Sequence, residues 1–358
     1  MVGEDLSSSQ LAEGPRAPLT SDELRARHGV LEYEVHEATS SMGLTRWFWG
    51  EGVCLIASDR LAEARGVAPP QWVARFYEHH LRRAPILEHV NNLAPAAALA
   101  EMYRRSPDPD ALVLLERCYS WYRDSDAATR APNGALEHWP GGVWADTVYM
   151  AGEFLLRAGR ALGRPEMVDE AVTQWLAHAD QLQDPESGLF AHGTHMGERI
   201  DCHWGRANAW IALAGVDLWH MTESHEVRDK VLVQLSALAE LQPEHGVWDV
   251  LVDSPPEVAG IVETSAAAGL GAAMLRAGRH LQQNEPENPL GDVLFNAGDL
   301  AVRGSLAYVQ DGWLTRVSAG TILQLIPFGY SVIRDDRPQP WGQGLALEAL
   351  AAYSQTHD

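Results

Sequence analysis

The strongest constraint on the fold is a series of helical pairs that runs from about residue 45 toward the C-terminus. Within each pair, apolar residues recur at positions i, i+3, i+4 and i+7, the spacing of an amphipathic helix. The first helix of a pair is generally the more apolar, which predicts buried inner helices wrapped by an outer amphipathic layer. The predicted pairs span residues 55–81, 94–122, 147–182, 207–241 and 265–302, and a less regular sixth unit spans 321–353.

The spacing of these units selects the architecture. The units start near residues 45, 94, 147, 207, 265 and 321, so consecutive starts lie about 50–60 residues apart and are uneven. Open helical repeats of the tetratricopeptide kind keep a near-constant period of about 34 residues. Six uneven hairpins instead predict a closed all-α toroid, an (α/α)6 barrel, whose long loops gather at one end and form the site. A chain of 358 residues is compatible with one such large domain.

The N-terminal segment differs from the rest of the chain. Residues 1–20 are small and polar, so residues 1–28 are predicted to be a disordered or loosely attached arm, and residues 29–358 a single catalytic barrel domain. The N-terminus has no apolar signal-like core, and no stretch is long enough to span a bilayer. Three scattered cysteines fit a reducing compartment, so a cytoplasmic location is expected.

The charge and the aromatic content of the chain narrow the range of expected binding partners. The formal net charge is −22 and no block of Lys or Arg occurs, so nucleic acid and anionic membrane surfaces are not expected as partners. Thirteen tryptophans are many for this length, and such a surplus often supplies stacking surfaces for ligands such as sugars. These features favour an enzyme or binding protein for small polar molecules.

Asp146 is the principal catalytic candidate. It stands at the start of a strongly apolar helix, close to Trp144 and Tyr149 and after a Gly-Gly turn. A carboxyl group flanked by aromatic rings is partly desolvated, which would raise its pKa and suit it to act as a general acid. The alternative is that Asp146 is an N-cap that accepts hydrogen bonds from the first N–H groups of the helix. The segment by itself leaves both interpretations open.

The other unusual residues lie in loops between the predicted hairpins or at the starts of inner helices. His138 and His192 are loop histidines that either serve a site or bond to the backbone. Arg206 and Trp210 share one helix face, as do Trp204 and Asn208, because each pair is four residues apart. An arginine can bind a carboxylate and a tryptophan can stack on a sugar, whereas an ion pair and core packing are the structural alternatives. Glu263 and Ser265 head another inner helix, where they either cap it or face the site.

No metal or cofactor is expected. His192, His195, Cys202 and His203 lie close in sequence, but their spacing matches no standard zinc pattern. The chain has no Gly-rich phosphate loop and no Gly-x-Ser-x-Gly nucleophile elbow. The expected chemistry therefore depends on side chains alone.

Four segments in register resemble the unsaturated uronyl hydrolases of the rhamnogalacturonyl hydrolase type, glycoside hydrolase family 105. The resemblance covers about residues 46–353. Its most specific parts are Trp144-Ala-Asp146-Thr-Val-Tyr149-Met150, Gly188-Leu-Phe190-Ala-His192-Gly193, Trp204-Gly-Arg206-Ala-Asn208-Ala-Trp210 and Glu263-Thr-Ser265. It implies a six-hairpin enzyme acting on oligosaccharides whose non-reducing end is a 4,5-unsaturated uronic acid, galacturonyl or glucuronyl.

The same resemblance implies a mechanism and a set of site residues. The family's catalytic Asp falls on Asp146, which would protonate C4 of the double bond and then activate a water to attack C5. One carboxyl acting twice differs from the usual two-carboxylate scheme. The resemblance places substrate-binding residues at Asn91, His138, Trp144, Met150, His192, Trp204, Arg206, Asn208, Trp210, Glu263 and Ser265. Arg206 would bind the uronate carboxylate.

One departure and two alternatives accompany this assignment. The family usually has an acid in the loop that opens the second hairpin, where this chain has Asn91. An amide cannot ionise, so support for Asp146 or for the water would differ. The alternatives are a barrel enzyme acting on saturated uronides or a sugar epimerase using His192 or His203, and a non-catalytic carbohydrate-binding toroid.

Overall fold

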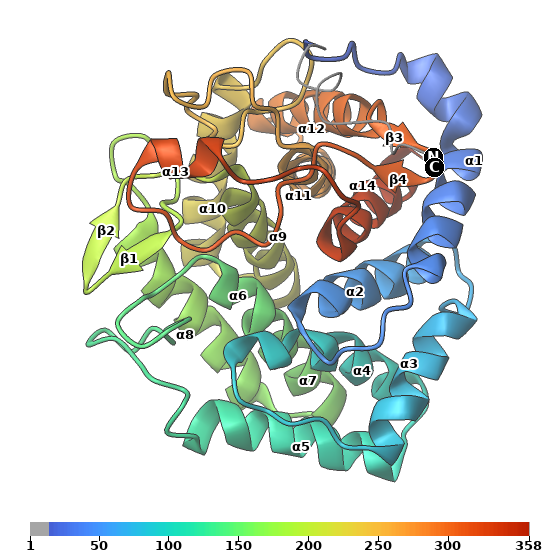
Figure 1. The fold of residues 1–358 in the computed structure, drawn as a ribbon, viewed down its shortest axis with the longest axis vertical. Coiled ribbons are helices and arrows are strands. Elements are labelled where there is room, and N and C mark those ends of the chain that lie inside the picture. The colour runs from blue at the N-terminus through green and yellow to red at the C-terminus, as the bar shows by residue number, and fades with distance from the viewer. Residues whose placement is uncertain (1–13, 358) are drawn as a thin grey trace, which may run out of the picture.

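The computed structural model describes residues 14–357, which form two concentric layers of helices (Figure 1). The inner layer consists of α2 (Trp49–Ala64), α4 (Ala94–Arg105), α6 (Asp146–Met150) continued by α7 (Gly152–Leu162), α9 (Gly205–Thr222), α11 (Thr264–Asn284) and α14 (Pro340–His357). The outer layer consists of α1 (Ser21–Ser41), α3 (Gln71–Arg82), α5 (Pro109–Asp124), α8 (Pro165–Leu182), α10 (His225–Glu240) and α12 (Leu290–Leu306).

The inner helices form a closed ring. Helix α2 packs on α4, α4 on α7, the α6–α7 pair on α9, α9 on α11, α11 on α14, and α14 returns to α2. The last contact is close because a Cβ on Gly344 of α14 would lie 2.6 Å from the Val53 side chain of α2, so only glycine fits there. The predicted all-α (α/α)6 barrel is thus confirmed.

The sixth hairpin is not the one predicted. Residues 321–353 were expected to form a helical pair, but this region holds only the short α13 (Pro327–Ser331) and the first part of α14. Helix α14 packs instead against α1, from the other end of the described chain. The helical period alone could not reveal this pairing, because the two partners are separated by the whole barrel.

The predicted boundary of the N-terminal arm is wrong for residues 21–28. These residues form the first turns of α1, where Thr20 and Glu23 make a reciprocal capping box and the side chains of Leu24 and His28 are buried. The preceding segment is also attached, since Leu19 donates from its N–H to the carbonyl of Arg303. Residues 1–13 of the predicted arm lie outside the described residues.

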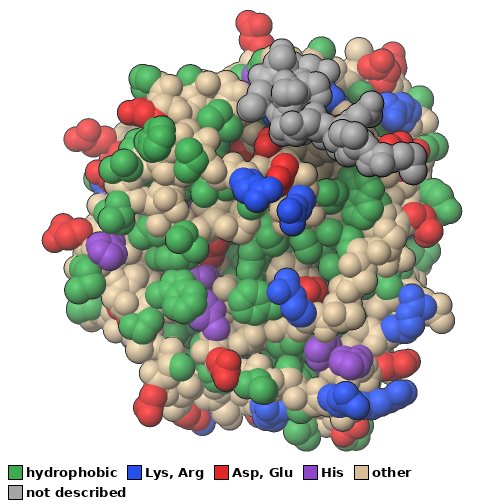
Figure 2. Space-filling model, viewed as in Figure 1, with side chains coloured by type: hydrophobic (Ala, Val, Ile, Leu, Met, Phe, Trp, Pro, Cys, Tyr) green, Lys and Arg blue, Asp and Glu red, His purple; other side chains and the backbone are tan. Residues whose placement is uncertain are grey.

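Loops between the helices carry the short 3-10 helix η2 (Val90–Asn92) and two small strand pairs. The strand pairs are antiparallel: β1 (Gly193–His195) with β2 (Glu198–Ile200), and β3 (Val309–Gln310) with β4 (Trp313–Leu314). In the view of Figure 1, hydrophobic side chains gather over the middle of the face (Figure 2). No helix among the described residues is long and apolar enough to cross a membrane.

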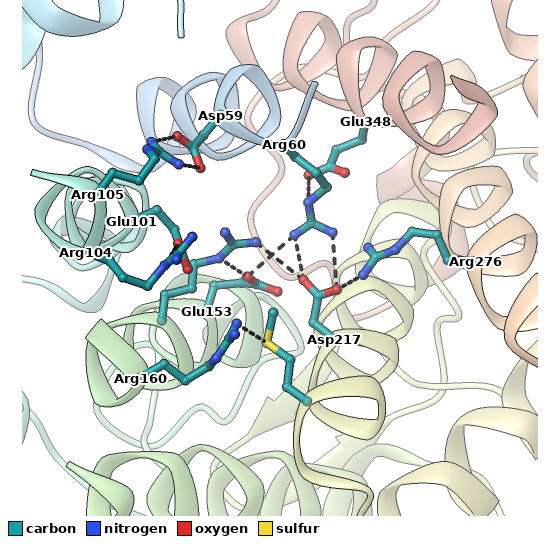
Figure 3. Close-up of polar contacts among 12 residues, drawn as sticks. Asp59, Arg60, Glu101, Arg104, Arg105, Glu153, Arg160, Asp217, Arg276 and Glu348 are labelled. Carbon is teal, nitrogen blue, oxygen red and sulfur yellow. Dashed lines mark hydrogen bonds and ion pairs between the residues drawn. The ribbon is translucent and has the colours of Figure 1, made fainter. Parts of the chain in front are cut away.

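A cluster of buried charges fills the ring deeper along the inner helices (Figure 3). We call it the lumen network, and it consists of Arg60, Glu153, Arg157, Asp217, Arg276 and Glu348, contributed by α2, α7, α9, α11 and α14. Its three arginines and three carboxylates balance in formal charge.

Asp217 is the hub of the lumen network. Its carboxylate accepts hydrogen bonds from Arg60 at 2.5 and 3.2 Å, contacts Arg157 at 3.5 Å and also binds Arg276. Its side chain is 1% exposed, so water cannot replace these partners. A buried charge that loses its counter-charge retains its desolvation penalty, which makes such sites costly to disrupt.

We therefore expect Asp217→Asn to lower the free energy of unfolding by about 3–5 kcal/mol, because the change leaves the arginines of the lumen network without their shared acceptor. Urea titration followed by circular dichroism would measure the loss. Asp22→Asn is the matched control, since it breaks the ion pair between Asp22 and Arg25 on the solvent-exposed face of α1 and should change little. Equal stability of the two variants would contradict the proposed contribution of the lumen network to the free energy of unfolding.

Candidate active site

Asp146 is the first residue of α6, and its side chain is not used in capping. The N-cap residue is Ala145, and no side-chain cap bond is made there, so the capping interpretation of Asp146 is wrong. The side chain is 13% exposed, and its Oδ2 lies 3.3 Å from Nε2 of His192, an ion-pair contact that is poorly aligned for a regular hydrogen bond. The backbone fixes this approach because the Ala145 N–H donates to the His192 carbonyl at 2.9 Å.

The expected direction of the Asp146 pKa is also wrong. Burial does act on this carboxyl as the largest single influence and would raise its pKa, as the flanking rings suggested. The contact with His192, together with the electrostatic influence of His138 and Arg206, outweighs burial and lowers the pKa below its ordinary value. Asp146 is therefore ionised at neutral pH in the free protein, since a carboxyl with a lowered pKa has lost its proton there.

His138 is a neutral partner near the carboxylate. Burial lowers its pKa to about 3, although the charge of Asp146 opposes the shift. Its Nε2 lies 3.4 Å from the Asn91 amide nitrogen, which can only donate, so Nδ1 carries the ring proton and faces the Thr147 hydroxyl at 3.1 Å. Asn91 thus holds the tautomer of His138, a role that does not require an acid.

Aromatic rings continue on both sides of His192. Trp144 stacks on His138 with centroids 4.7 Å apart and planes 8° apart, and it meets the His192 ring edge-on at 5.3 Å. Trp144 also pairs through its backbone with Gly193, where an added Cβ would lie 2.6 Å from the indole. The glycine after His192 is therefore needed for the loop to approach Trp144.

The series of rings extends to the starts of three other inner helices. His192 lies 4.4 Å from the Trp204 ring, and the guanidinium of Arg206 lies 4.4 Å above Trp204 and 5.5 Å from Trp341. Trp341 in turn stacks on Trp49 at 4.3 Å. Because these residues begin α9, α14 and α2, the contacts show that the starts of the inner helices meet at one end of the barrel.

Arg206 is buried among protein acceptors. Its Nη1 donates to the carbonyl and hydroxyl oxygens of Ser318 at 2.9 and 2.8 Å, and its Nη2 donates to the carbonyl of Ala319 at 2.9 Å. Its side chain is 0% exposed, and Glu263 lies 3.7 Å away. This geometry gives Arg206 the role of holding the 318–321 segment, and it disfavours the predicted direct contact with a uronate carboxylate.

Glu263 and Ser265 belong to the same buried cluster. Glu263 caps α11 by accepting from the Ala266 N–H, and it also accepts from the Ser265 hydroxyl and the Ser318 N–H. The capping alternative stated from the sequence is therefore the observed one. Both side chains are buried and stabilise the segment that also binds Arg206.

The remaining predicted substrate-binding residues divide into two groups. Asn91, His138 and Trp144 lie beside Asp146 and keep 6–9% exposure. The side chains of Met150, His192, Trp204, Asn208 and Trp210 are 0–1% exposed. Direct contact between the second group and a sugar stays a prediction, whereas their contacts with the protein are observed; Asn208, for example, bonds to both backbone groups of Phe190.

Sequence reasoning missed three residues that the structure brings to the site. Tyr330 in α13 bonds to His192, and Trp49 and Trp341 extend the aromatic series. The two tryptophans could have been predicted from the sequence, because each stands at the start of an inner helix, as Asp146 and Trp204 do. The sequence gives no indication for Tyr330, since it lies 138 residues from His192 in a segment without helical periodicity.

The histidines and cysteine examined for metal binding do not converge. Among residues 14–357, no group of three or more His, Cys, Asp or Glu side chains is placed to hold a metal ion. His203, which an alternative mechanism would use, pairs through Nδ1 with Asp253 at 2.9 Å.

Arg206→Gln tests the role given to Arg206. We expect a loss of about 3–5 kcal/mol in the free energy of unfolding, because Glu263 loses its counter-charge and the 318–321 carbonyls lose their donors. Urea titration would measure it, and limited proteolysis would report loosening of the segment. Arg334→Gln, which removes an exposed cation nearby, is the control and should change neither. A variant with unchanged stability but weakened binding of uronates would favour direct carboxylate recognition instead.

Comparison with known proteins agrees with the resemblance drawn from the sequence. Residues 26–357 match the profile of Glycosyl Hydrolase Family 88. A relative, the unsaturated rhamnogalacturonyl hydrolase YesR of Bacillus subtilis, is 34% identical over 249 residues, which cover 64% of this chain and 67% of that protein.

Solved structures agree in fold. A possible member of the GH105 family from Salmonella enterica is 26% identical, with a TM-score of 0.80 and complete coverage of both chains. The unsaturated glucuronyl hydrolase of Bacillus sp. GL1 is 18% identical, with a TM-score of 0.66 over 91% of this chain and 94% of that one, and it supports the fold alone. The match over nearly all described residues, together with the identity to YesR, shows that this chain is a glycoside hydrolase belonging to Glycosyl Hydrolase Family 88.

Proposed function

We propose that this protein removes a 4,5-unsaturated uronic acid from the non-reducing end of an oligosaccharide, with Asp146 as acid and then as base. The observation that carries the proposal is the carboxylate of Asp146, which is not used to cap its helix. The side chains that act most strongly on its pKa are those of His192, His138 and Arg206, none of which is a carboxylate. Ordinary glycosidases need two carboxyl groups about 5–9.5 Å apart, whereas hydration of a vinyl ether can use one.

The proposed reaction uses the carboxyl group of Asp146 twice. The protonated carboxyl first adds a proton to C4 of the double bond, which leaves positive charge at C5 and at the ring oxygen. The resulting carboxylate then accepts a proton from the water that attacks C5, so that Asp146 is regenerated as the acid. The hemiketal formed at C5 opens, and the remaining sugar is released.

An ionised Asp146 can still begin as an acid if the substrate changes its pKa. A uronate brings a negative charge close to the double bond, and a like charge beside a carboxylate raises that carboxylate's pKa. We therefore propose that binding of an anionic sugar causes Asp146 to take up a proton. His192 and His138 flank the carboxylate on which this charge would act.

Asp146→Asn should reduce release of the unsaturated uronate by roughly 10²–10⁴-fold, the usual contribution of a positioned acid–base group. The loss of ultraviolet absorbance of the alkene, measured on lyase-generated disaccharides of pectin and glycosaminoglycan type, gives the rate directly. Binding of the same disaccharide should survive, because the amide preserves the shape of the side chain.

Asp201→Asn is the matched control, because Asp201 lies on the neighbouring hairpin segment, is 67% exposed and pairs only with Arg199 among the described residues. It should leave the rate unchanged. Undiminished turnover in Asp146→Asn would contradict the proposal, whereas binding without turnover in the unaltered protein would favour a non-catalytic toroid. Turnover of saturated uronides would favour the alternative enzyme.

The pH dependence follows from the lowered pKa of Asp146. Because the first step needs the protonated carboxyl, kcat/KM should fall as the pH rises through the pKa of the free protein, which lies below the ordinary carboxyl range. The corresponding fall in kcat should occur at higher pH. The value of kcat reports the enzyme–substrate complex, in which the negative charge of the uronate raises the pKa of Asp146. Rates measured from pH 3 to 8 test the order of the two limbs.

The substrate supplies the control for this prediction. An unsaturated sugar whose carboxyl is methyl-esterified carries no charge, so its kcat and kcat/KM limbs should coincide more closely. For the substrate with a free carboxyl group, a fall in kcat at lower pH than the fall in kcat/KM would contradict the proposed uptake of a proton by Asp146.

A further inference from the structure

The segment between β4 and α14 forms a closed loop over the site, which we call the 319–334 loop. Its neck is a hydrogen bond from the Ala319 N–H to the Arg334 carbonyl at 2.7 Å. Most of its large apolar side chains face solvent, with exposures of 54–65% for Ile322, Leu325, Ile326, Phe328 and Val332. A compact surface loop with adjacent ends is often functional.

Only two side chains of the 319–334 loop are buried. Thr321 belongs to the neck, near Arg206, and Tyr330 is the other. The Tyr330 ring is 0% exposed, and its hydroxyl lies 2.7 Å from Nδ1 of His192. The apolar tip of the loop thus meets the site through one hydroxyl group.

The direction of this hydrogen bond follows from its neighbours. The Gln324 N–H donates to the Tyr330 oxygen at 3.4 Å, which leaves the hydroxyl proton free for His192. On the other edge of the ring, Nε2 of His192 faces the Asp146 carboxylate, which can only accept. When the imidazole is neutral it carries one proton, and a proton on Nε2, which faces the carboxylate, leaves Nδ1 bare to accept from the tyrosine hydroxyl.

We propose that Tyr330 is a positioning residue that holds the Nε2 edge of the His192 ring toward Asp146. The hydroxyl of Tyr330 donates to Nδ1, fixes the Nε2–H tautomer and prevents the ring from rotating away from the carboxylate. Tyr330 is itself buried and so acts on the sugar only through His192. This inference rests on the proposed catalytic role of Asp146.

The test compares Tyr330→Phe with Tyr308→Phe. Each change removes one hydroxyl from a buried tyrosine; the Tyr308 hydroxyl accepts from the Arg16 N–H, far from His192 in the chain. Tyr330→Phe should lower kcat about tenfold with little change in KM, since losing one orienting hydrogen bond has about that effect. Tyr308→Phe should leave both constants unchanged.

Nitrogen NMR of protein labelled with 15N-histidine supplies a readout that a merely structural tyrosine would not move. The His192 signals, assigned by their loss in His192→Gln, should show a protonated Nε2 and an unprotonated, hydrogen-bonded Nδ1 in the free protein. Tyr330→Phe should shift the Nδ1 signal, and Tyr308→Phe should not.

Two results would overturn the inference: a protonated Nδ1 in neutral His192 of the unaltered protein, or a Tyr330→Phe variant whose His192 signals and kcat match those of the unaltered protein. Failure of the proposed function would look different. Asp146→Asn would then retain turnover, while the His192 signals, which need no substrate, would still report the tyrosine contact.

Discussion

The structure depends on charge held inside a ring of apolar helices. The lumen network joins five inner-layer helices through three arginines and three carboxylates, with Asp217 contacting all three arginines. Transfer of these ions from water is unfavourable by itself, and only mutual pairing offsets the penalty. The five contributing helices must therefore present their charged residues to one another, which restricts their relative register. Apolar Ala- and Gly-rich faces could slide past one another more freely than such a network allows.

This register also sets the geometry of the site. The lumen network lies about 8–12 residues beyond the first residues of α2, α9, α11 and α14, roughly 12–18 Å along each helix at about 1.5 Å per residue. Fixing that level fixes the helix starts, where Asp146, Arg206 and Trp341 meet. The N-terminal ends of inner helices carry partial positive charge. Arg206 lies at the same end, in a protein whose formal net charge is −22.

The sequence predicted periodic features and missed those that arise from distant pairing. Helical spacing was enough for the barrel, and the motif around Asp146 was enough for the catalytic candidate, because both are local. The pairing of α14 with α1 and the contact of Tyr330 with His192 join segments far apart in the chain, which no spacing encodes. The pKa of Asp146 was predicted in the wrong direction because the nearby Trp144 and Tyr149 are visible in the sequence, whereas the contact with a histidine 46 positions away is not. Arg206 was assigned to a ligand because a sequence does not reveal which carbonyls surround a guanidinium.

The pairing of α1 with α14 has a consequence for how the protein folds. Because α14 is also the helix that packs against both α2 and α11, the ring cannot be completed until this last helix has been synthesised. Up to that point, five hairpins leave the apolar flank of α2 and the charges of the lumen uncovered on the ribosome. Such long-range closure slows folding and exposes intermediates to aggregation. The ring of inner helices is therefore completed only when α14 packs against α2 and α11.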